Sequence, residues 1–147
     1  LFEVIVNYFQ NFKDERIYKD EKIYFYKLAQ LLTSDILHIR ELKENIRMDY
    51  SHLIGCADYK IPQVMRGLGI LEYNDKLANI IDNKKEIKIN SEYEVEIRAN
   101  MLVVIDLIKE KLKNKVCSID INDYIWSQGR NKNIELKPYH LTRNTNY

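Results

Sequence analysis

The segment from Gly55 to Val64 holds a carboxylate at a position suited to a ligand. Asp58 lies in a short turn, four residues before Pro62. Proline is tolerated at the first helical position, where its missing N–H is not needed, and it disfavours helical backbone at the residue before it. The pattern predicts a helix that starts at Pro62, with Asp58 on the non-helical backbone ahead of it. There the carboxylate either interacts with a ligand through its negative charge or caps the helix.

The sequence pattern predicts that the elements around this turn are helices. Apolar residues spaced three and four apart predict a helix over residues 21–41. They are Phe25, Leu28, Leu32, Ile36 and Ile39. Ser91 with Glu94 forms a capping box that opens the longest expected helix, which runs to about residue 112. Within it residues 101–105 are apolar on all sides and could form a buried strand, but the cap and the Lys-rich end favour a buried helix.

Two further helices complete the expected domain. Asn74 can cap a helix through residue 81, and Ser118 or Asp120 can cap a last helix through about residue 129. With only four glycines, two prolines and no low-complexity segment, the chain leaves little room for linkers. We therefore expect one all-α domain over residues 1–147.

Composition excludes several classes of function. The chain is 46% hydrophobic and 31% charged, which is ordinary for a globular domain. Its 23 basic residues are interleaved with 22 acidic ones, for a net charge of +1, so DNA or polymeric RNA is not an expected partner. The two cysteines indicate a reducing compartment. No apolar stretch has the length of a membrane span, and we expect a cytoplasmic protein, with a nuclear location also open.

Metal chemistry is not expected either. His38, His52 and His140 are too far apart in the sequence to form a helical metal pair, and Cys56 and Cys117 lack the spacing of a zinc site. We expect no metal and no other cofactor.

Five motifs occur in one order along the chain. They read Ala57-Asp58-Tyr59-Lys60-Ile61-Pro62-Gln63-Val64, Leu71-Glu72-Tyr73, Glu94-Val95-Glu96-Ile97-Arg98-Ala99, Asp123-Tyr124-Ile125-Trp126 and Pro138-Tyr139-His140-Leu141-Thr142-Arg143. In this order they resemble the queuosine salvage family, which are queuosine 5'-phosphate N-glycosylases, from about Phe25 to the last residue. The resemblance implies a helical fold similar to that of helical DNA glycosylases. Members of the family are longer, so we expect that an N-terminal half is missing here.

The resemblance also implies a reaction, the hydrolysis of queuosine 5'-phosphate to release queuine for the salvage of a tRNA modification. As the N-glycosidic bond breaks, positive charge builds on the ribose, and a nearby carboxylate can stabilise it, attack it or activate water. Position seven of this base is carbon. An enzyme therefore cannot protonate that atom to make the base a better leaving group. Tight binding of the base must therefore contribute more of the rate enhancement.

The motifs assign roles to particular residues by resemblance. Asp58 matches the aspartate that reads the base. Cys56 stands where relatives commonly have phenylalanine, so stacking on the base falls to Tyr59 or Tyr124 if it occurs. Lys27 resembles a lysine that contacts the 5'-phosphate, a role that suits an ammonium group.

The second aspartate motif of the family, Leu-Asp-Tyr-Tyr-Leu-Trp-Asp, fits this chain in two registers. Aligned on Trp126 without gaps, its aspartates fall on Asn122 and Ser127, and neither residue carries a charge. A one-residue deletion instead matches Asp123 and Tyr124 to the Asp-Tyr pair. The sequence leaves both registers open, and simple capping of a helix start would also explain Asn122 and Asp123.

These assignments give one predicted site and two functional hypotheses. The predicted catalytic residues are Asp58 and Asp123, and the predicted substrate-binding residues are Cys56, Asn122, Tyr124, Ser127 and Lys27. The first hypothesis is a nucleotide N-glycosylase. The second, motivated by Asn122, Ser127 and Cys56, is a catalytically impaired relative that binds a nucleobase or acts as a scaffold. Arg98 is expected to form a partly buried structural pair and Arg143 to tie down the tail, and neither is expected to contact the ligand.

Overall fold

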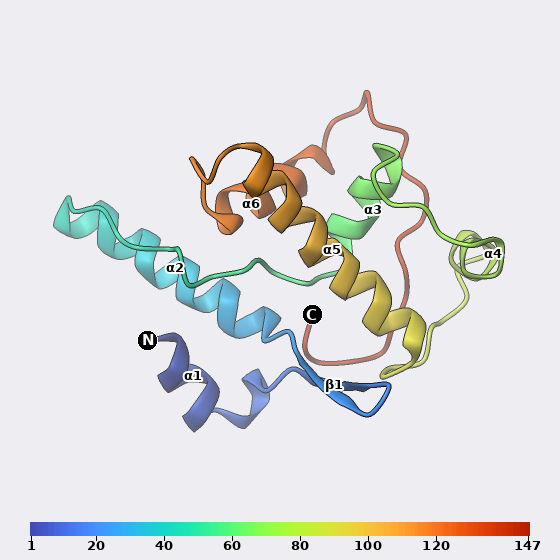
Figure 1. Ribbon diagram of the computed structural model, residues 1–147, viewed down its shortest axis with the longest axis horizontal. Coiled ribbons are helices and arrows are strands. Elements are labelled where there is room, and N and C mark those ends of the chain that lie inside the picture. The colour runs from blue at the N-terminus through green and yellow to red at the C-terminus, as the bar shows by residue number, and fades with distance from the viewer.

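A computed structural model describes residues 1–147 and consists of helices with one small hairpin at the edge of the molecule (Figure 1). The helices are α1 (Phe2–Tyr8), the 3-10 helix η1 (Gln10–Phe12), α2 (Lys27–Glu44), α3 (Lys60–Gly67), α4 (Asp75–Asp82), α5 (Glu92–Lys111) and α6 (Ser118–Gln128). The strands are β1 (Glu15–Tyr18) and β2 (Glu21–Tyr24). After α2 the chain turns back alongside that helix and reaches α3 near the middle of α5 (Figure 1).

The expectation of an all-α domain is wrong, because β1 and β2 pair as an antiparallel hairpin with Tyr18 opposite Glu21. Lys19 and Asp20 connect the strands, and both have positive φ, at 48° and 65°. A two-residue turn with positive φ at both positions matches the twist of paired strands. Asn-Gly is the usual sequence for such a turn, so Lys-Asp gave little local signal of it.

Helix α2 begins later than predicted and presents a different face. It starts at Lys27, and the expected first turn is strand β2 instead. Its buried face is partly polar, consisting of Ala29, Gln30, Thr33, Ser34 and Leu37. Of the predicted stripe, Phe25 is buried ahead of the helix and Ile39 is 52% exposed. The Gln30 Oε1 accepts a hydrogen bond from the Ile54 N–H at 3.2 Å, so this face binds the returning backbone.

Helices α4 and α5 follow their capping signals. The Asn74 side chain accepts from the Leu77 N–H at the start of α4, and the Ser91 hydroxyl accepts from the Glu94 N–H at the start of α5. Helix α6 starts at Ser118, but its N-cap is Cys117 rather than Ser118 or Asp120, and the Asp120 carboxylate accepts from the Cys117 N–H. Residues 101–105 are helical, but α5 is not buried on all sides, since Val103 is 55% exposed.

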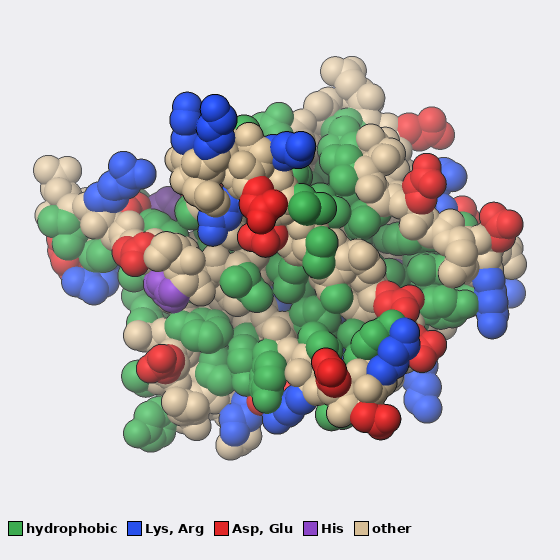
Figure 2. Space-filling view, viewed as in Figure 1, with side chains coloured by type: hydrophobic (Ala, Val, Ile, Leu, Met, Phe, Trp, Pro, Cys, Tyr) green, Lys and Arg blue, Asp and Glu red, His purple; other side chains and the backbone are tan.

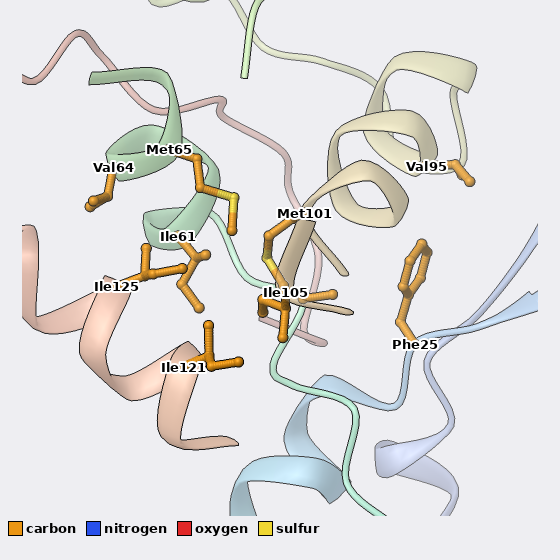
Figure 3. Close-up of a cluster of buried hydrophobic side chains, with 10 residues drawn as sticks. Phe25, Ile61, Val64, Met65, Val95, Met101, Ile105, Ile121 and Ile125 are labelled. Atoms are coloured by element: carbon orange, nitrogen blue, oxygen red, sulfur yellow. The ribbon is translucent and has the colours of Figure 1, made fainter. Parts of the chain in front are cut away.

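The main hydrophobic core lies where α3, α5 and α6 meet, with Phe25 reaching it from the start of α2 (Figure 3). Its buried side chains are Phe25, Ala57, Ile61, Val64, Met65, Val95, Met101, Ile105, Ile121 and Ile125. Ile121 and Ile125 of α6 point toward Ile61 of α3 and Ile105 of α5 (Figure 3). Ala57 and Ile61 both belong to this core. The packing therefore fixes the backbone on both sides of Asp58.

The surface is mixed in character. On the face in Figure 2, hydrophobic side chains gather over the middle, and charged groups of both signs lie around them. None of the helices combines the length and the apolar character that crossing a membrane requires.

Candidate functional site

The Asp58 carboxylate is buried and caps α3. Its Oδ1 accepts from the backbone N–H groups of Lys60 and Ile61, both at 2.9 Å. These two bonds start the helix at Lys60, two residues earlier than predicted, and Pro62 stays within the first turn, where a missing N–H is still tolerated. No protein group donates to Oδ2, and 6% of the residue is exposed. Asp58 therefore caps the helix with one oxygen, and its other oxygen has an unused capacity to accept a hydrogen bond.

A hydrogen-bonded bridge joins the Asp58 turn to α6. The Asn122 Oδ1 accepts from the Cys56 N–H at 2.8 Å, and the Asn122 Nδ2 donates to the Asp123 Oδ1 at 2.9 Å. Asn122 is buried and Asp123 is exposed. Asn122 from one motif register and Asp123 from the other thus lie next to each other beside the Asp58 turn.

Gly55 permits this close approach. Its φ is +116°, and a Cβ added to it would lie 3.1 Å from Ile105 Cδ1 and 3.5 Å from Asn122 Oδ1. L-residues rarely adopt that conformation. The turn therefore depends on glycine both for its backbone geometry and for space against α5 and α6.

We expect Gly55→Ala to lower the free energy of unfolding by about 1–3 kcal/mol, the usual cost of a residue held in a sparsely populated backbone region. Denaturant unfolding measures it. Gly69→Ala is the matched control, because Gly69 also has positive φ, at +70°, but an added Cβ meets nothing within 4 Å. A loss for Gly55→Ala no larger than that for Gly69→Ala would contradict the role of close packing.

Charged groups of two helices, α2 and α6, lie near the turn that holds Asp58. Burial raises the pKa of the Cys56 thiol to about 12, with Lys27 lowering it and Asp58, Asp123 and Asp35 raising it further. Lys27 and Asp35 belong to α2, Asp123 to α6 and Asp58 to the turn. The fold thus brings together Lys27, Asp58 and Asp123, which lie far apart in the sequence.

The pKa of Asp58 itself is raised above its ordinary 3.8, chiefly by burial. The Ile61 N–H, the Lys27 ammonium, the Lys60 N–H and the Arg98 guanidinium oppose this shift by favouring the charged form. Burial that raises a carboxyl pKa in the presence of an adjacent cation is a common arrangement at functional sites.

The remaining predicted residues lie around or away from this centre. The Cys56 side chain packs against Leu53 and against Ile119 of α6, while its backbone N–H bonds to Asn122. Ser127 donates to the Tyr124 carbonyl of its own helix at 2.6 Å, and Tyr124 is 67% exposed. The roles of these residues in binding stay predictions.

Of the two tyrosines that could stack on a base, Tyr59 lies nearer the turn. It directly follows Asp58, is 40% exposed and contacts the ring of Tyr139 with centroids 4.7 Å apart. Tyr124 is two positions from Asn122 on α6, about 200° around the helix, and so projects from a different face.

A cluster of four buried ionic side chains lies next to the turn that holds Asp58. It consists of Asp14, Arg16, Glu94 and Arg98, each at most 4% exposed. Arg98 was expected to form a structural pair, and it does, with Asp14 and with Glu94 at 3.1 Å. Arg143, which was expected to tie down the tail, forms an exposed pair with Glu86 at 3.3 Å. Sequence reasoning missed Asp14, because nothing near it in the sequence indicates that it binds a residue of α5.

The most prominent cavity lies away from these residues. This cavity, of about 550 Å³, is lined by residues between His38 and Ser51 and between Lys109 and Asp120, and none of the predicted site residues lines it. No three His, Cys, Asp or Glu side chains come together as metal ligands.

Comparison with known proteins agrees with the motifs. The family model described as Queuosine salvage protein matches residues 1–147. Proteins named queuosine 5'-phosphate N-glycosylase/hydrolase from Dictyostelium discoideum and Sphaerobacter thermophilus are each 32% identical, over 97% and 100% of this chain. The corresponding protein from Mus musculus is 31% identical over 97% of the chain. The chain spans 46%, 47% and 46% of the lengths of these relatives. It belongs to the queuosine salvage protein family.

Proposed function

We propose that the protein to which this chain belongs hydrolyses the N-glycosidic bond of queuosine 5'-phosphate and releases queuine. Relatives that match the whole chain carry the name of this activity. The observation that carries the proposal here is Asp58, a buried carboxylate with one oxygen bound to the start of α3 and the other without a protein donor. The proposed reaction involves no polymeric nucleic acid, and its proposed location is the cytoplasm.

The chemistry requires a binder for the base and a stabiliser for the ribose. Asp58 is proposed to accept hydrogen bonds from the edge of the base, as the matching aspartate of the family does. Asp123, held by the Asn122 amide, supplies the second carboxylate. A negative group at the ribose stabilises the positive charge of the oxocarbenium-like transition state and can activate the attacking water. Lys27 would bind the 5'-phosphate through its ammonium group.

A non-catalytic nucleobase-binding protein is the second candidate. Asn122, which replaces an aspartate in one register, is occupied by the Cys56 N–H and cannot supply negative charge. If Asp123 does not reach the ribose, the base would bind through Asp58 without turnover.

Chromatographic detection of queuine distinguishes the two candidates. The full-length natural protein that contains this chain is incubated with queuosine 5'-phosphate, with queuosine nucleoside and with guanosine 5'-phosphate. We expect the free base, queuine or guanine, to be released from the first at the highest rate, since only it has both the 7-deazaguanine base and the phosphate. Binding without release, measured by calorimetry, would favour the second candidate. Neither binding nor release would refute both.

Replacing Lys27 should shift the pH dependence of the reaction. Lys27 holds down the pKa of Asp58, so Lys27→Gln raises that pKa. If the charged form of Asp58 is the active one, activity falls as pH falls through this pKa. The acid limb of kcat/KM therefore moves to higher pH in Lys27→Gln. Lys43→Gln, near the far end of α2, is the control, and a limb at the same pH in all three proteins would contradict the coupling.

A further inference from the structure

Arg98 reaches from α5 to the backbone of the Asp58 turn. Its Nε donates to the carbonyl oxygen of Ala57, the residue before Asp58, at 2.8 Å. The guanidinium is held between two aromatic rings, 4.0 Å from the centroid of Phe25 and 4.4 Å from that of Tyr147. Arg98 is fully buried, so it contacts no substrate.

Asp14 connects the same guanidinium to the start of α2. Its carboxylate receives both Arg98 Nη groups, one of them with Nη1 3.0 Å from Oδ1. The Asp14 Oδ2 also accepts from the Lys27 N–H at 3.3 Å. The Asp14 carbonyl accepts from the N–H groups of Phe25 and Tyr26 at 2.9 and 3.2 Å. Arg98 and Asp14 thus form a continuous bridge from the backbone at Asp58 to the backbone at Lys27.

We propose that Arg98 and Asp14 are a positioning pair, which sets the distance between the Asp58 carboxylate and the Lys27 ammonium. The inference rests on the proposed function, in which these two groups bind the base and the 5'-phosphate of one nucleotide. The base and the phosphate lie at a spacing fixed by the ribose, so their two protein partners must also be held at a fixed spacing.

The geometry favours positioning over simple stabilisation. A buried ion pair is weak evidence for stability, because well-packed hydrophobic residues often do as well in its place. Here the pair bonds to the backbone at two points, Ala57 and Lys27, that are next to or within the proposed site. A planar guanidinium can donate in two directions at once, to the carboxylate and to the carbonyl, whereas a lysine ammonium is a compact charge without that fork.

Arg16 provides a matched control within the same cluster. Its Nε donates to Glu94 at 3.1 Å and its Nη1 lies 3.1 Å from the Asp14 carboxylate. It bonds to neither Ala57 nor Lys27. Arg98→Lys and Arg16→Lys therefore both replace a buried guanidinium and both keep the charge, but only the first breaks the bridge.

The test compares these variants in the full-length natural protein by amide hydrogen exchange and by steady-state hydrolysis of queuosine 5'-phosphate. We expect Arg98→Lys to speed exchange at the Lys60, Ile61 and Lys27 amides and to lower kcat/KM about 100-fold, the effect of a misplacement near 1 Å. Arg16→Lys should leave both readouts close to those of the unsubstituted protein. Equal effects of the two variants on both readouts would overturn the proposal.

Asp14→Asn is the second variant, in case Arg98→Lys does not fold. Asp14 has no bond to the Asp58 turn, so faster exchange at Lys60 and Ile61 in this variant shows that the bridge transmits position. Unchanged exchange there would also overturn the proposal. If the unsubstituted protein releases no queuine, the proposed function fails, and the exchange data alone decide whether the pair positions Asp58 and Lys27.

Discussion

Replacing Asp58 by asparagine should reduce queuine release by about 100- to 1,000-fold, the usual cost of removing one preorganised electrostatic group from an active site. The asparagine Oδ1 can still accept from the Lys60 and Ile61 N–H groups, so the cap of α3 is kept. The carboxylate charge and the acceptor character of Oδ2 are lost. Because the pKa of Asp58 is raised by burial, removing its charge should not lower the melting temperature.

Asp120→Asn is the matched control for this prediction. Asp120 also caps a helix with its carboxylate, accepting from the Cys117 N–H at the start of α6, and it belongs to no part of the proposed site. We expect this variant to release queuine at nearly the unsubstituted rate. Release by Asp58→Asn at that same rate would remove Asp58 from the mechanism, and binding of queuine measured in both variants would show whether recognition of the base was lost with it.

The sequence predicted those parts of the fold that local chemistry determines. Asn74 and Ser91 marked the starts of α4 and α5 because a capping side chain bonds a backbone N–H only three residues ahead. The hairpin escaped prediction because its turn, Lys19-Asp20, lacks the glycine or asparagine that usually adopts positive φ. The buried face of α2 escaped as well, since Gln30 faces inward only to bind Ile54 on the returning segment.

The candidate site divides in the same way. Asp58 could be predicted as a candidate from its own motif. The motif of α6 was sufficient to predict that either Asn122 or Asp123 belongs to the same candidate site. The contribution of Asp14 could not be found, because its partner Arg98 lies 84 residues later in the chain. Side chains that touch a ligand leave short motifs, whereas those that hold them in place are defined by contacts between distant elements.

Glu94→Gln should destabilise the protein even more than Gly55→Ala does. Glu94 is fully buried, and its Oε1 accepts from Arg98 Nη1 at 3.1 Å while its Oε2 accepts from Arg16 Nε at 3.1 Å. Glutamine of the same shape leaves two buried guanidinium groups facing one carboxylate, that of Asp14. Breaking a buried pair in this way costs about 3–5 kcal/mol, because one charge stays in the interior without compensation.

Urea unfolding at constant pH measures this loss as a lower midpoint with an unchanged slope, which indicates a change in stability rather than in the compactness of either state. Glu110→Gln, on the exposed side of the same helix, is the control and should stay within about 0.5 kcal/mol of the unsubstituted protein. A loss for Glu94→Gln as small as that for Glu110→Gln would mean that the cluster is solvated or rearranges. Asp14 and Arg98 belong to this cluster. Such a result would therefore also count against the proposal that they hold Asp58 and Lys27 at a fixed distance.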